Sequence, residues 1–177
     1  MATSLRVSKE NLERYEVDNK SLYALSFENP VMLVFLRHLG CVFCREALRD
    51  VAAQRAKIEE TGVMIVLIHM EEVALARAFV EKYGLAGVHH VSDPDRKLYA
   101  QFGLAKGTIS QLFGLRTLVR GMKQGVSLEQ FGGSSFGDAF QMPGVFIIRE
   151  GEIAAEYVHR TVSDRPDYYD LAAYCTI

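Results

Sequence analysis

The chain of 177 residues contains no tryptophan, only three cysteines and four prolines, and its net charge is only −2 at pH 7. Three cysteines are too few for the disulfide framework of a small secreted domain. The small net charge argues against a general nucleic-acid-binding protein. No apolar run reaches the length of a membrane span, because runs such as residues 31–36 and 63–68 are only as long as strands.

The first residues, 1–6, also lack the apolar stretch of a signal peptide. We therefore expect a cytoplasmic protein with no integral membrane segment, in a reducing compartment where a cysteine pair is more often catalytic than structural. The remaining composition is ordinary, with 49% hydrophobic and 24% charged residues. The length suits a single domain over residues 1–177 with a core of its own.

Two of the three cysteines, Cys41 and Cys44, lie three positions apart between an apolar run and a segment of helical periodicity. The run at residues 31–37 predicts a strand, and the segment after Cys44 predicts a helix. Free N–H groups and the positive dipole end at a helix start favour thiolate over thiol. The sequence therefore predicts a redox-active Cys-x-x-Cys pair of the thioredoxin type.

Two other interpretations of the pair are a zinc site and two unreactive core thiols. A structural zinc site usually has four ligands, and the only obvious additions here are His38 and the distant Cys175. We expect no bound metal and no cofactor. Cys44 shares the apolar face of the predicted helix, so we expect it to be the buried sulfur and Cys41 the more exposed one.

Charged residues on either side of the cysteines are candidates for a role in the site. Arg37 and Arg45 either lower a thiol pKa or are ordinary surface arginines. His38 is either a proton donor or a local structural residue. Cys175, near the end of the chain, is either a distant resolving thiol or incidental to the chemistry.

The rest of the chain alternates strand and helix patterns, with a hairpin at each end. Asp18 and Asn19 form the turn of the first hairpin, and residues 149–152 form the turn of the second. The pattern predicts an α/β fold with a central mixed sheet flanked by helices. Its predicted elements are a short helix after Ser8, buried strands at 31–37 and 63–68, a strand at 88–92, helices from 71, from 93 and at 167–174, and strands at 145–148 and 153–158. We expect Gly62 to end the helix that follows Cys44, and Leu98, Tyr99 and Phe102 to form the apolar face of the helix from 93.

Residues 96–128 contain no acidic side chain but six basic ones. Apolar residues recur at near-helical spacing around 110–123, which predicts an inserted basic amphipathic helix. Such a helix either contacts a membrane surface, an anionic substrate or a partner, or it covers the fold with a solvated basic face.

Residues 33–46, LVFLRHLGCVFCRE, resemble the peroxiredoxin-like branch of the alkyl hydroperoxide reductase/thiol-specific antioxidant superfamily. Residues 93–104, DPDRKLYAQFGL, resemble that superfamily too, as do residues 137–148 and 164–168. The branch includes selenoprotein-L-like and prostamide/prostaglandin F synthase-like proteins. The resemblance implies a thioredoxin-like fold and the reduction of peroxides or disulfides by thiols.

The chain departs from ordinary peroxiredoxins at two positions that the family uses. Cys41 stands where the family has Thr or Ser, if Cys44 is aligned with the peroxidatic cysteine. Pro143 stands where the family has a thiolate-activating arginine, and it resembles instead the cis-proline of thioredoxins. The departures favour disulfide exchange over efficient peroxide reduction.

The sequence thus predicts a thiol-dependent oxidoreductase that reduces a peroxide or disulfide. Cys41 attacks and Cys44 resolves, or the two roles are reversed. The resemblance implies thioredoxin or glutathione as the reductant, and a homodimer is one expected assembly. Alternatives are a lipid endoperoxide reductase and a non-enzymatic redox-sensing or zinc-binding module.

Overall fold

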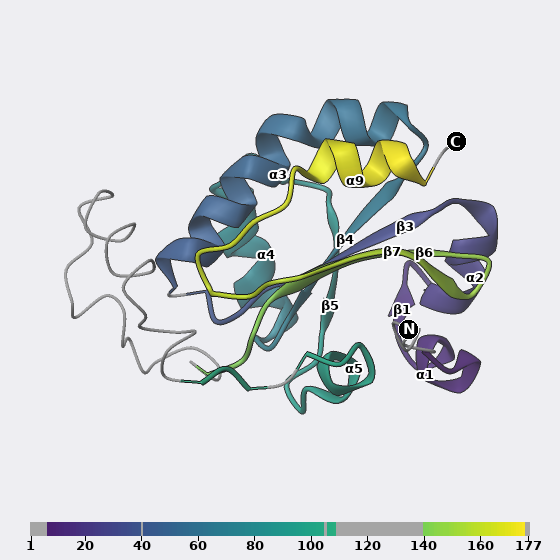
Figure 1. The fold of residues 1–177 in the computed structure, drawn as a ribbon, viewed down its shortest axis with the longest axis horizontal. Helices are drawn as coiled ribbons and strands as arrows, with labels where there is room; N and C mark the ends of the chain where they lie inside the picture. The colour runs from purple at the N-terminus through teal and green to yellow at the C-terminus, as the bar shows by residue number, and fades with distance from the viewer. Residues whose placement is uncertain (1–6, 40, 105, 109–139, 176–177) are drawn as a thin grey trace.

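A five-stranded mixed sheet forms the middle of the computed structural model, which describes residues 7–39, 41–104, 106–108 and 140–175 (Figure 1). Its strand order is β5-β4-β3-β6-β7, with β3, β4 and β5 parallel and β6 and β7 antiparallel to their neighbours. This confirms the predicted α/β class and its mixed sheet. The strands are β3 (Val31–Phe35), β4 (Met64–His69), β5 (His89–Ser92), β6 (Gly144–Arg149) and β7 (Glu152–Val158).

The central strand β3 is buried along its whole length, as its uninterrupted apolar sequence predicts. It pairs in parallel with β4 and in antiparallel with β6, where Phe35 lies opposite Gly144. Because that pair lies at the end of β3 and the start of β6, the residues after Phe35 lie beside the residues before Gly144. This register brings the cysteine segment and Pro143 together.

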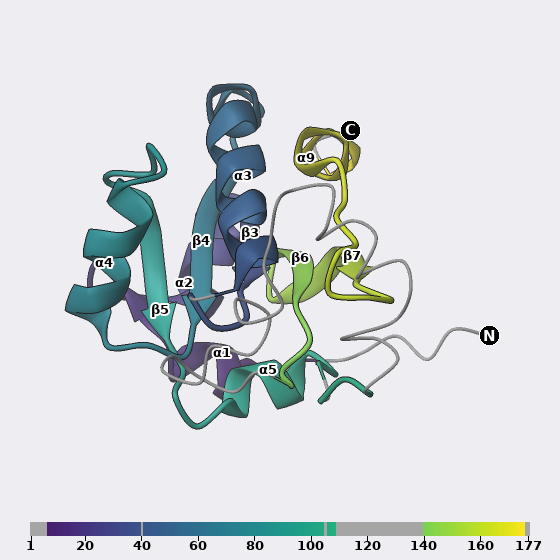
Figure 2. The same ribbon diagram turned by 90° about the vertical axis from the view of Figure 1, so that its left-hand side faces the viewer.

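Helices cover both faces of the sheet, and each face has its own apolar cluster. Figures 1 and 2 show α3 and α9 side by side on one face, with α5 on the other. The first face is covered by α3 (Val42–Glu60), α4 (Val73–Glu81) and α9 (Tyr168–Tyr174), and the second by α1 (Lys9–Glu13), α2 (Leu22–Glu28) and α5 (Lys97–Gln101).

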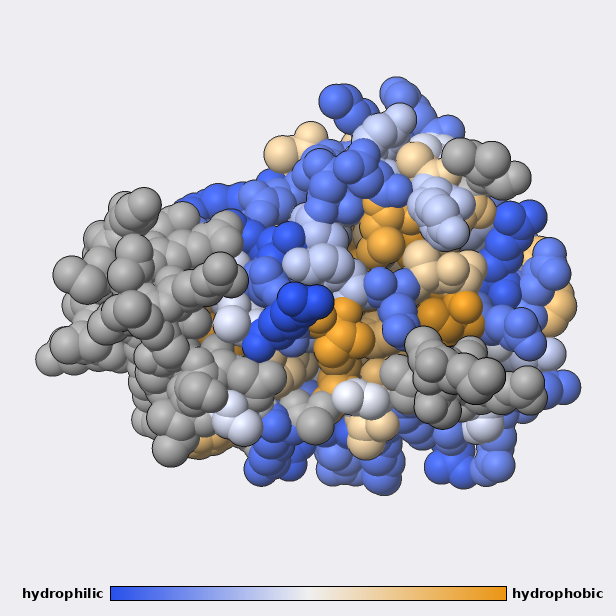
Figure 3. Space-filling model, in the orientation of Figure 1, coloured by the Kyte–Doolittle hydropathy of each residue, from blue (hydrophilic) through white to orange (hydrophobic). Residues whose placement is uncertain are grey.

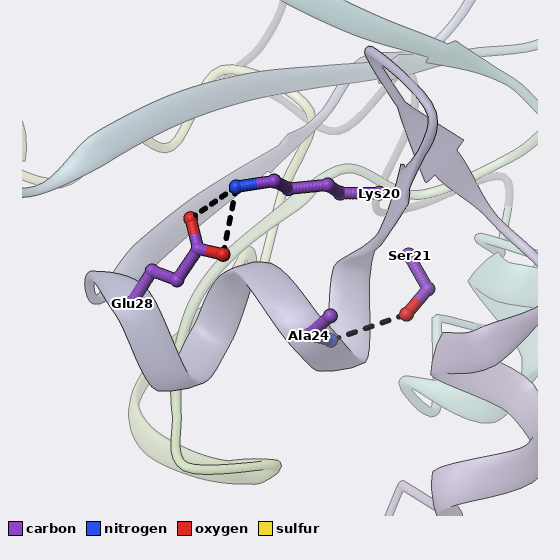
Figure 4. Close-up of polar contacts among 4 residues, drawn as sticks. All are labelled: Lys20, Ser21, Ala24 and Glu28. Carbon is purple, nitrogen blue, oxygen red and sulfur yellow. Dashed lines mark hydrogen bonds and ion pairs between the residues drawn. The ribbon is translucent and has the colours of Figure 1, made fainter.

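The first hairpin is confirmed but is shorter than its sequence pattern suggests. Strands β1 (Glu16–Val17) and β2 (Lys20–Ser21) flank Asp18 and Asn19, which both have positive φ angles. The helix α2 follows at once and was not predicted. Ser21 caps it by accepting a hydrogen bond from the amide of Ala24, and Lys20 pairs with Glu28 at its far end (Figure 4).

The helix after β5 begins later than predicted, at Lys97 instead of residue 93. The carboxylate of Asp93 accepts hydrogen bonds from the amides of Lys97, Leu98 and Tyr99. Residues 93–96 therefore form a turn that presents a carboxylate to the helix start, where negative charge is favoured. Leu98, Tyr99 and Phe102 are buried, which confirms the predicted apolar face.

The predicted turns after α3 and between β6 and β7 are confirmed, whereas α4 begins at Val73 instead of residue 71 and β3 ends at Phe35 instead of residue 37. Gly62 ends α3 with a φ angle of +83°, and the β6–β7 hairpin turns at Glu150 and Gly151, both with positive φ. Apolar surface remains in patches around β7, whose side chains alternate in exposure (Figure 3). The predicted helix around 110–123 lies outside the described residues. Within the described ranges, no helix is long and apolar enough to cross a membrane.

Candidate redox site

Cys41 lies at the N-cap of α3, immediately after the turn that follows β3. Its amide donates to the carbonyl of His38 at 3.0 Å, and its carbonyl accepts the amide of Arg45 at 3.2 Å. The first bond closes the turn, and the second begins the helix. The cysteine sulfur is thus held where the amides of the first helical turn favour an anion.

Arg37 contacts the cysteine pair from the end of β3 in two ways. Its guanidinium Nη1 donates to the sulfur of Cys41 at 3.0 Å, and its backbone amide donates to the sulfur of Cys44 at 3.2 Å. The Nε atom donates to the carbonyl of Gln141 at 3.1 Å, which fixes the direction of the side chain. Arg37 is 5% exposed, so it is no ordinary surface arginine.

Both sulfurs are reduced and buried, with Cys41 4% and Cys44 3% exposed. The prediction that Cys44 is buried is confirmed. The prediction that Cys41 is the more exposed one is wrong, because the two cysteines are about equally buried and the guanidinium of Arg37 lies against the sulfur of Cys41. An oxidant must therefore be small, or neighbouring side chains must move, before the sulfur is reached.

The two thiols have opposite electrostatic environments. A hydrogen bond from Cys44 lowers the pKa of Cys41 to about 6, and the Arg37 charge and the amides of Cys44 and Phe43 act in the same direction against burial. Burial raises the pKa of Cys44 well above its ordinary value, and negative charge on Cys41 raises it further. The pair is therefore arranged to hold one thiolate, on Cys41, and one thiol, on Cys44.

The structure brings only one of the two candidate arginines to the sulfurs. Arg45 is half-buried on α3, and its Nε has no hydrogen-bond partner among the described residues. Its backbone amide donates to the carbonyl of Cys41, but in the described part of the chain no hydrogen bond links the Arg45 side chain to either sulfur. His38 is buried, and its backbone carbonyl accepts the amide of Cys41. This bond is a structural contribution of the backbone and does not involve the imidazole ring.

Pro143 lies beside the site, but its peptide bond is trans, so the predicted cis-proline is wrong. The segment is held extended on both sides of the proline. Gln141 forms a bridge with Lys106, and Gly144 pairs with Phe35. Such a run suits the trans isomer, which is the more stable one for an X–Pro bond by roughly 0.5–1 kcal/mol.

Two buried residues that the sequence analysis did not identify as part of the site contribute to the position of Arg37: Gln141 contacts its side chain, and Tyr99 contacts the backbone of the preceding residue. The backbone carbonyl of Gln141 accepts a hydrogen bond from Nε of Arg37, and the Gln141 side chain donates to the carbonyl of Leu104 at 2.8 Å. The hydroxyl of Tyr99 donates to the carbonyls of Leu36 and Ile68, at the ends of β3 and β4. Both contacts join segments far apart in the chain, so local sequence patterns carry no signal for them.

A small pocket of about 10 Å³ lies beside Cys44, which is close to the smallest volume that holds a water molecule. Within the described residues, Cys44 lines this pocket and Cys41 does not. The segment between β7 and α9 supplies the opposite wall, with His159, Asp164 and Arg165. Arg165 also forms an ion pair with the buried Glu46 of α3. This pair links the segment between β7 and α9 to the helix that begins at the cysteine pair.

Cys175 ends α9, away from the pair, and its carbonyl accepts Arg149 at 3.0 Å. Burial raises its pKa, which is the opposite of what a reactive thiol needs. In residues 7–39, 41–104, 106–108 and 140–175, no group of three or more His, Cys, Asp or Glu side chains is arranged to hold a metal ion.

A sequence model described as AhpC/TSA antioxidant enzyme matches residues 50–163, more than half of the chain. The chain belongs to the AhpC/TSA antioxidant enzyme family. The match begins after Cys44, so it establishes the family without including the cysteine pair. The peroxiredoxin-like resemblance of the sequence is thereby confirmed, while the roles of Cys41 and Cys44 rest on their geometry.

Relatives of the AhpC/TSA chain include a prostamide/prostaglandin F synthase, a peroxiredoxin-like protein and a thioredoxin-like protein. Prostamide/prostaglandin F synthase of Xenopus tropicalis is 27% identical over 158 residues, covering 88% of this chain and 75% of that protein. Peroxiredoxin-like 2C of Homo sapiens is 29% identical over 85 residues, covering 48% and 37%. Thioredoxin-like protein AAED1, chloroplastic, of Arabidopsis thaliana is 23% identical over 157 residues, covering 84% and 62%. The chain spans less than two thirds of the last two relatives.

Solved structures confirm the thioredoxin-like fold. The peroxidoxin BcpB of Mycobacterium tuberculosis superposes with a TM-score of 0.58 at 16% identity, covering 89% of this chain and 83% of that one. The bacterioferritin comigratory protein of Xanthomonas campestris gives a TM-score of 0.60 at 17% identity, covering 90% and 88%. Together with the family, these neighbours support a thiol-dependent peroxide or disulfide oxidoreductase.

Proposed function

We propose that this AhpC/TSA chain reduces hydroperoxides through a cycle in which Cys41 attacks and Cys44 resolves. The observation that carries the proposal is the contact of the Arg37 guanidinium with the sulfur of Cys41, at 3.0 Å in a buried site. A cation at hydrogen-bond distance from a thiol at a helix start favours the thiolate, which is the nucleophile.

Arg37 also supplies the positive charge that is absent at position 143, where this chain has a proline. Pro143 occupies the position of the family's activating arginine, and this departure favoured disulfide exchange over peroxide reduction. In the folded chain, the guanidinium comes from the end of β3 instead, and the carbonyl of Gln141 orients it. This restores a cation beside the thiolate, so we place peroxides before disulfides as substrates.

The reaction balances with the two cysteines and an external reductant. The Cys41 thiolate attacks one peroxide oxygen, the O–O bond breaks, and an alcohol or water leaves after protonation. Cys41 is then a sulfenic acid. The sulfur of Cys44 attacks it, a disulfide forms and water leaves. A dithiol or two monothiols, of the thioredoxin or glutathione class, supply two electrons and restore the pair.

Rapid mixing of the reduced protein with hydrogen peroxide, an organic hydroperoxide and a small disulfide tests this proposal. We expect fast peroxide consumption, one oxidised pair per chain, and a Cys41–Cys44 bond in the peptide mass map. Cys175→Ser is the matched control and should react like the wild type. Loss of the reaction in Cys175→Ser, or disulfide reduction much faster than peroxide reduction, would contradict the proposal.

A lipid endoperoxide is the second candidate substrate, because one relative is named a prostamide/prostaglandin F synthase. The pocket beside Cys44, at about 10 Å³, is far too small for a lipid, so such a substrate would have to reach Cys41 from its other side. Saturable turnover of an endoperoxide, in parallel with hydrogen peroxide assays, tests this candidate. A cytoplasmic location and a homodimer remain proposals for fractionation and sedimentation experiments.

A further inference from the structure

His159 is a buried histidine on the wall of the pocket that Cys44 lines. It follows β7 directly and is 6% exposed. Its Nδ1 atom is buried and has no hydrogen-bond partner among the described residues. A buried, unpaired ring nitrogen is costly, and it is usually retained with a bound water or a chemical role. The pocket is large enough for one water molecule.

The reaction proposed above needs a proton acceptor in this place. Cys41 is held as a thiolate, but Cys44 is a buried thiol whose pKa is raised well above the ordinary value by burial. Cys44 must lose its proton before or while it attacks the oxidised Cys41. Because Cys44 is 3% exposed, solvent hydroxide reaches it poorly.

We propose that His159 accepts the proton of Cys44, through a water molecule in the pocket, when Cys44 attacks the oxidised Cys41. The inference rests on the proposed function, since it names the base for its second step. In that step the S–H bond of Cys44 breaks, its sulfur bonds to Cys41, and the group on Cys41 leaves with its electron pair. The proton passes by way of the water to the imidazole and then to solvent.

The other ionisable groups around His159 do not suit this role. Arg37 and Arg165 are cations and have no acceptor atom. Burial raises the pKa of Tyr168, and burial with the charge of Asp164 raises that of Tyr157, whose ring lies edge-on to His159; both hydroxyls therefore keep their protons. Asp164 is the exception: its Oδ2 accepts the amide of Arg160 at 3.1 Å, but a carboxylate accepts more than one hydrogen bond. Asp164→Asn is therefore needed as a further variant, and a slower, pH-dependent second release in it alone would assign the proton to Asp164.

The imidazole of His159 is neutral near pH 7 and so has a free lone pair. Burial lowers its pKa to about 4, with Asp164 acting in the opposite direction and Arg165 in the same one. A buried neutral imidazole next to a water is a general base that functions from about pH 5 upward. Glu46 is the rival acceptor, because its Oε1 is buried without a partner while Oε2 binds Arg165.

An aryl disulfide, dithionitrobenzoic acid, lets the attack by Cys41 and the attack by Cys44 be measured separately, because each attack releases one coloured thiolate. Attack by Cys41 releases the first thiolate, and attack by Cys44 on the mixed disulfide releases the second. We would use Cys175→Ser as the parent protein, so that only two thiols react. The variants are His159→Gln and His159→Ala, with Glu46→Gln for the rival and His89→Gln, a histidine on β5, as the matched control.

We expect His159→Gln to slow the second release about 100-fold and to leave the first within twofold. The parent's second release should be independent of pH between about pH 5.5 and 7.5, whereas that of the variant should rise about tenfold per pH unit. Imidazole buffer should restore the rate in His159→Ala. A defect in packing alone would change neither the pH profile nor the response to imidazole.

Other outcomes overturn the inference in distinguishable ways. A second release with the parent's rate and pH profile in both His159 variants shows that His159 accepts no proton. The same pH dependence in Glu46→Gln, with His159→Gln unaffected, assigns the proton to Glu46. A parent protein that gives no second release and no Cys41–Cys44 disulfide refutes the proposed function itself, and the inference with it.

Discussion

Two pairs of ionisable side chains lie near the ends of neighbouring strands: the buried Cys41 and Cys44 after β3, and the buried His69 at the end of β4 with the half-buried His90 in β5. In the histidine pair, Nε2 of His69 lies 3.0 Å from Nδ1 of His90. Burial lowers the pKa of His69 to about 4, and the neighbouring His90 acts in the same direction. Burial also lowers the pKa of His90, and nearby Arg77 lowers it further.

The cysteine pair is buried more completely than the histidine pair, yet one of its members is arranged to carry a charge. The difference comes from the neighbours, because Arg37 and the first amides of α3 lie against Cys41, whereas the groups near the histidines are like-charged or neutral. Burial alone therefore makes both pairs neutral, and an opposite charge inside the site is what keeps a reactive anion. The four predictions below test this contrast.

Removal of the charged member of the cysteine pair should have the largest effect. Cys41→Ser should lower the rate of the first peroxide turnover more than about 1000-fold, because a serine hydroxyl stays protonated at neutral pH. Stopped-flow consumption of hydrogen peroxide by reduced protein measures the rate. Cys44→Ser is the matched control and should keep the first turnover while forming no internal disulfide. If Cys44→Ser loses the first turnover and Cys41→Ser keeps it, the two roles are reversed.

The histidine pair should destabilise the fold in acid. Between about pH 6.5 and pH 4, the unfolded chain binds a proton at His69 that the folded chain does not. The stability associated with this histidine is complete above the unfolded pKa and is lost as the pH falls towards the folded one. The loss is on the order of 3 kcal/mol for a fully developed shift of this size. Urea unfolding at a series of pH values measures it.

His159 is also buried with a pKa of about 4, and the pKa of His90 is lowered as well, so three histidines contribute to this acid dependence. His69→Asn should therefore reduce the pH slope of the unfolding free energy by about one proton and leave the parts due to His90 and His159. His89→Gln, a substitution at a half-exposed position of the same strand as His90, is the control and should leave the slope unchanged. An unchanged slope in His69→Asn would mean that His69 takes up its proton in the folded state.

Removal of the Arg37 guanidinium should make Cys41 less ionised at neutral pH, so that the cysteine pair becomes neutral like the histidine pair. In Arg37→Met, the pKa of Cys41 should rise from about 6 towards its ordinary value, because burial is then less opposed. Alkylation by iodoacetamide at pH 7 should slow about tenfold, which corresponds to a rise of roughly two pKa units, because the thiolate fraction at pH 7 then falls from about nine tenths to about one tenth. The pH dependence of alkylation gives the midpoint directly.

Two substitutions on α3 serve as comparisons for Arg37→Met. Arg49→Met removes an exposed charge from the same helix and should leave alkylation within twofold. Arg45→Met tests the other arginine that the sequence proposes, and we expect a much smaller effect than for Arg37. An effect of Arg45→Met as large as that of Arg37→Met would mean that the general charge of the helix start, not the contact at 3.0 Å, sets the pKa.

Much of the fold follows from the sequence, because hydrophobic periodicity and turn residues are local signals. The buried run of β3 and the glycine stop at Gly62 were predicted on this basis. The helix α2 was missed since its apolar residues directly follow a two-residue strand, where strand alternation and helix periodicity cannot be told apart. The start of α5 was misplaced because Asp93 caps the helix from outside it.

The site was predictable only in part, for the same physical reason. The spacing of Cys41 and Cys44 and the nearby Arg37 are local, and all three meet in the folded chain. Arg37 is oriented by Gln141, which is 104 positions away. His159 reaches the pocket of Cys44 only through the pairing of β6 with β7. Contacts of this kind depend on tertiary structure, which leaves no periodic signal in a single sequence.

The smallest effect on stability should come from breaking the pair that His89 forms with Asp18 at the surface. Nδ1 of His89 lies 3.3 Å from Asp18 of the first hairpin, but the two side chains are 32% and 80% exposed. Solvent screens such a pair, and exposed ion pairs contribute at most about 1 kcal/mol. Asp18→Asn, which keeps the size and a tolerance for positive φ, should therefore change the unfolding free energy at pH 6 by less than that amount.

The same experiment separates burial from pairing as the origin of the contrast. His89 and His90 are neighbours in one strand, yet His90 faces a buried partner and His89 an exposed carboxylate. If solvent exposure decides the outcome, raising the salt concentration should remove the small effect of Asp18→Asn and leave the acid sensitivity due to His69 intact. A loss of several kcal/mol in Asp18→Asn, insensitive to salt, would show that the surface pair is coupled to the fold as strongly as the buried ones.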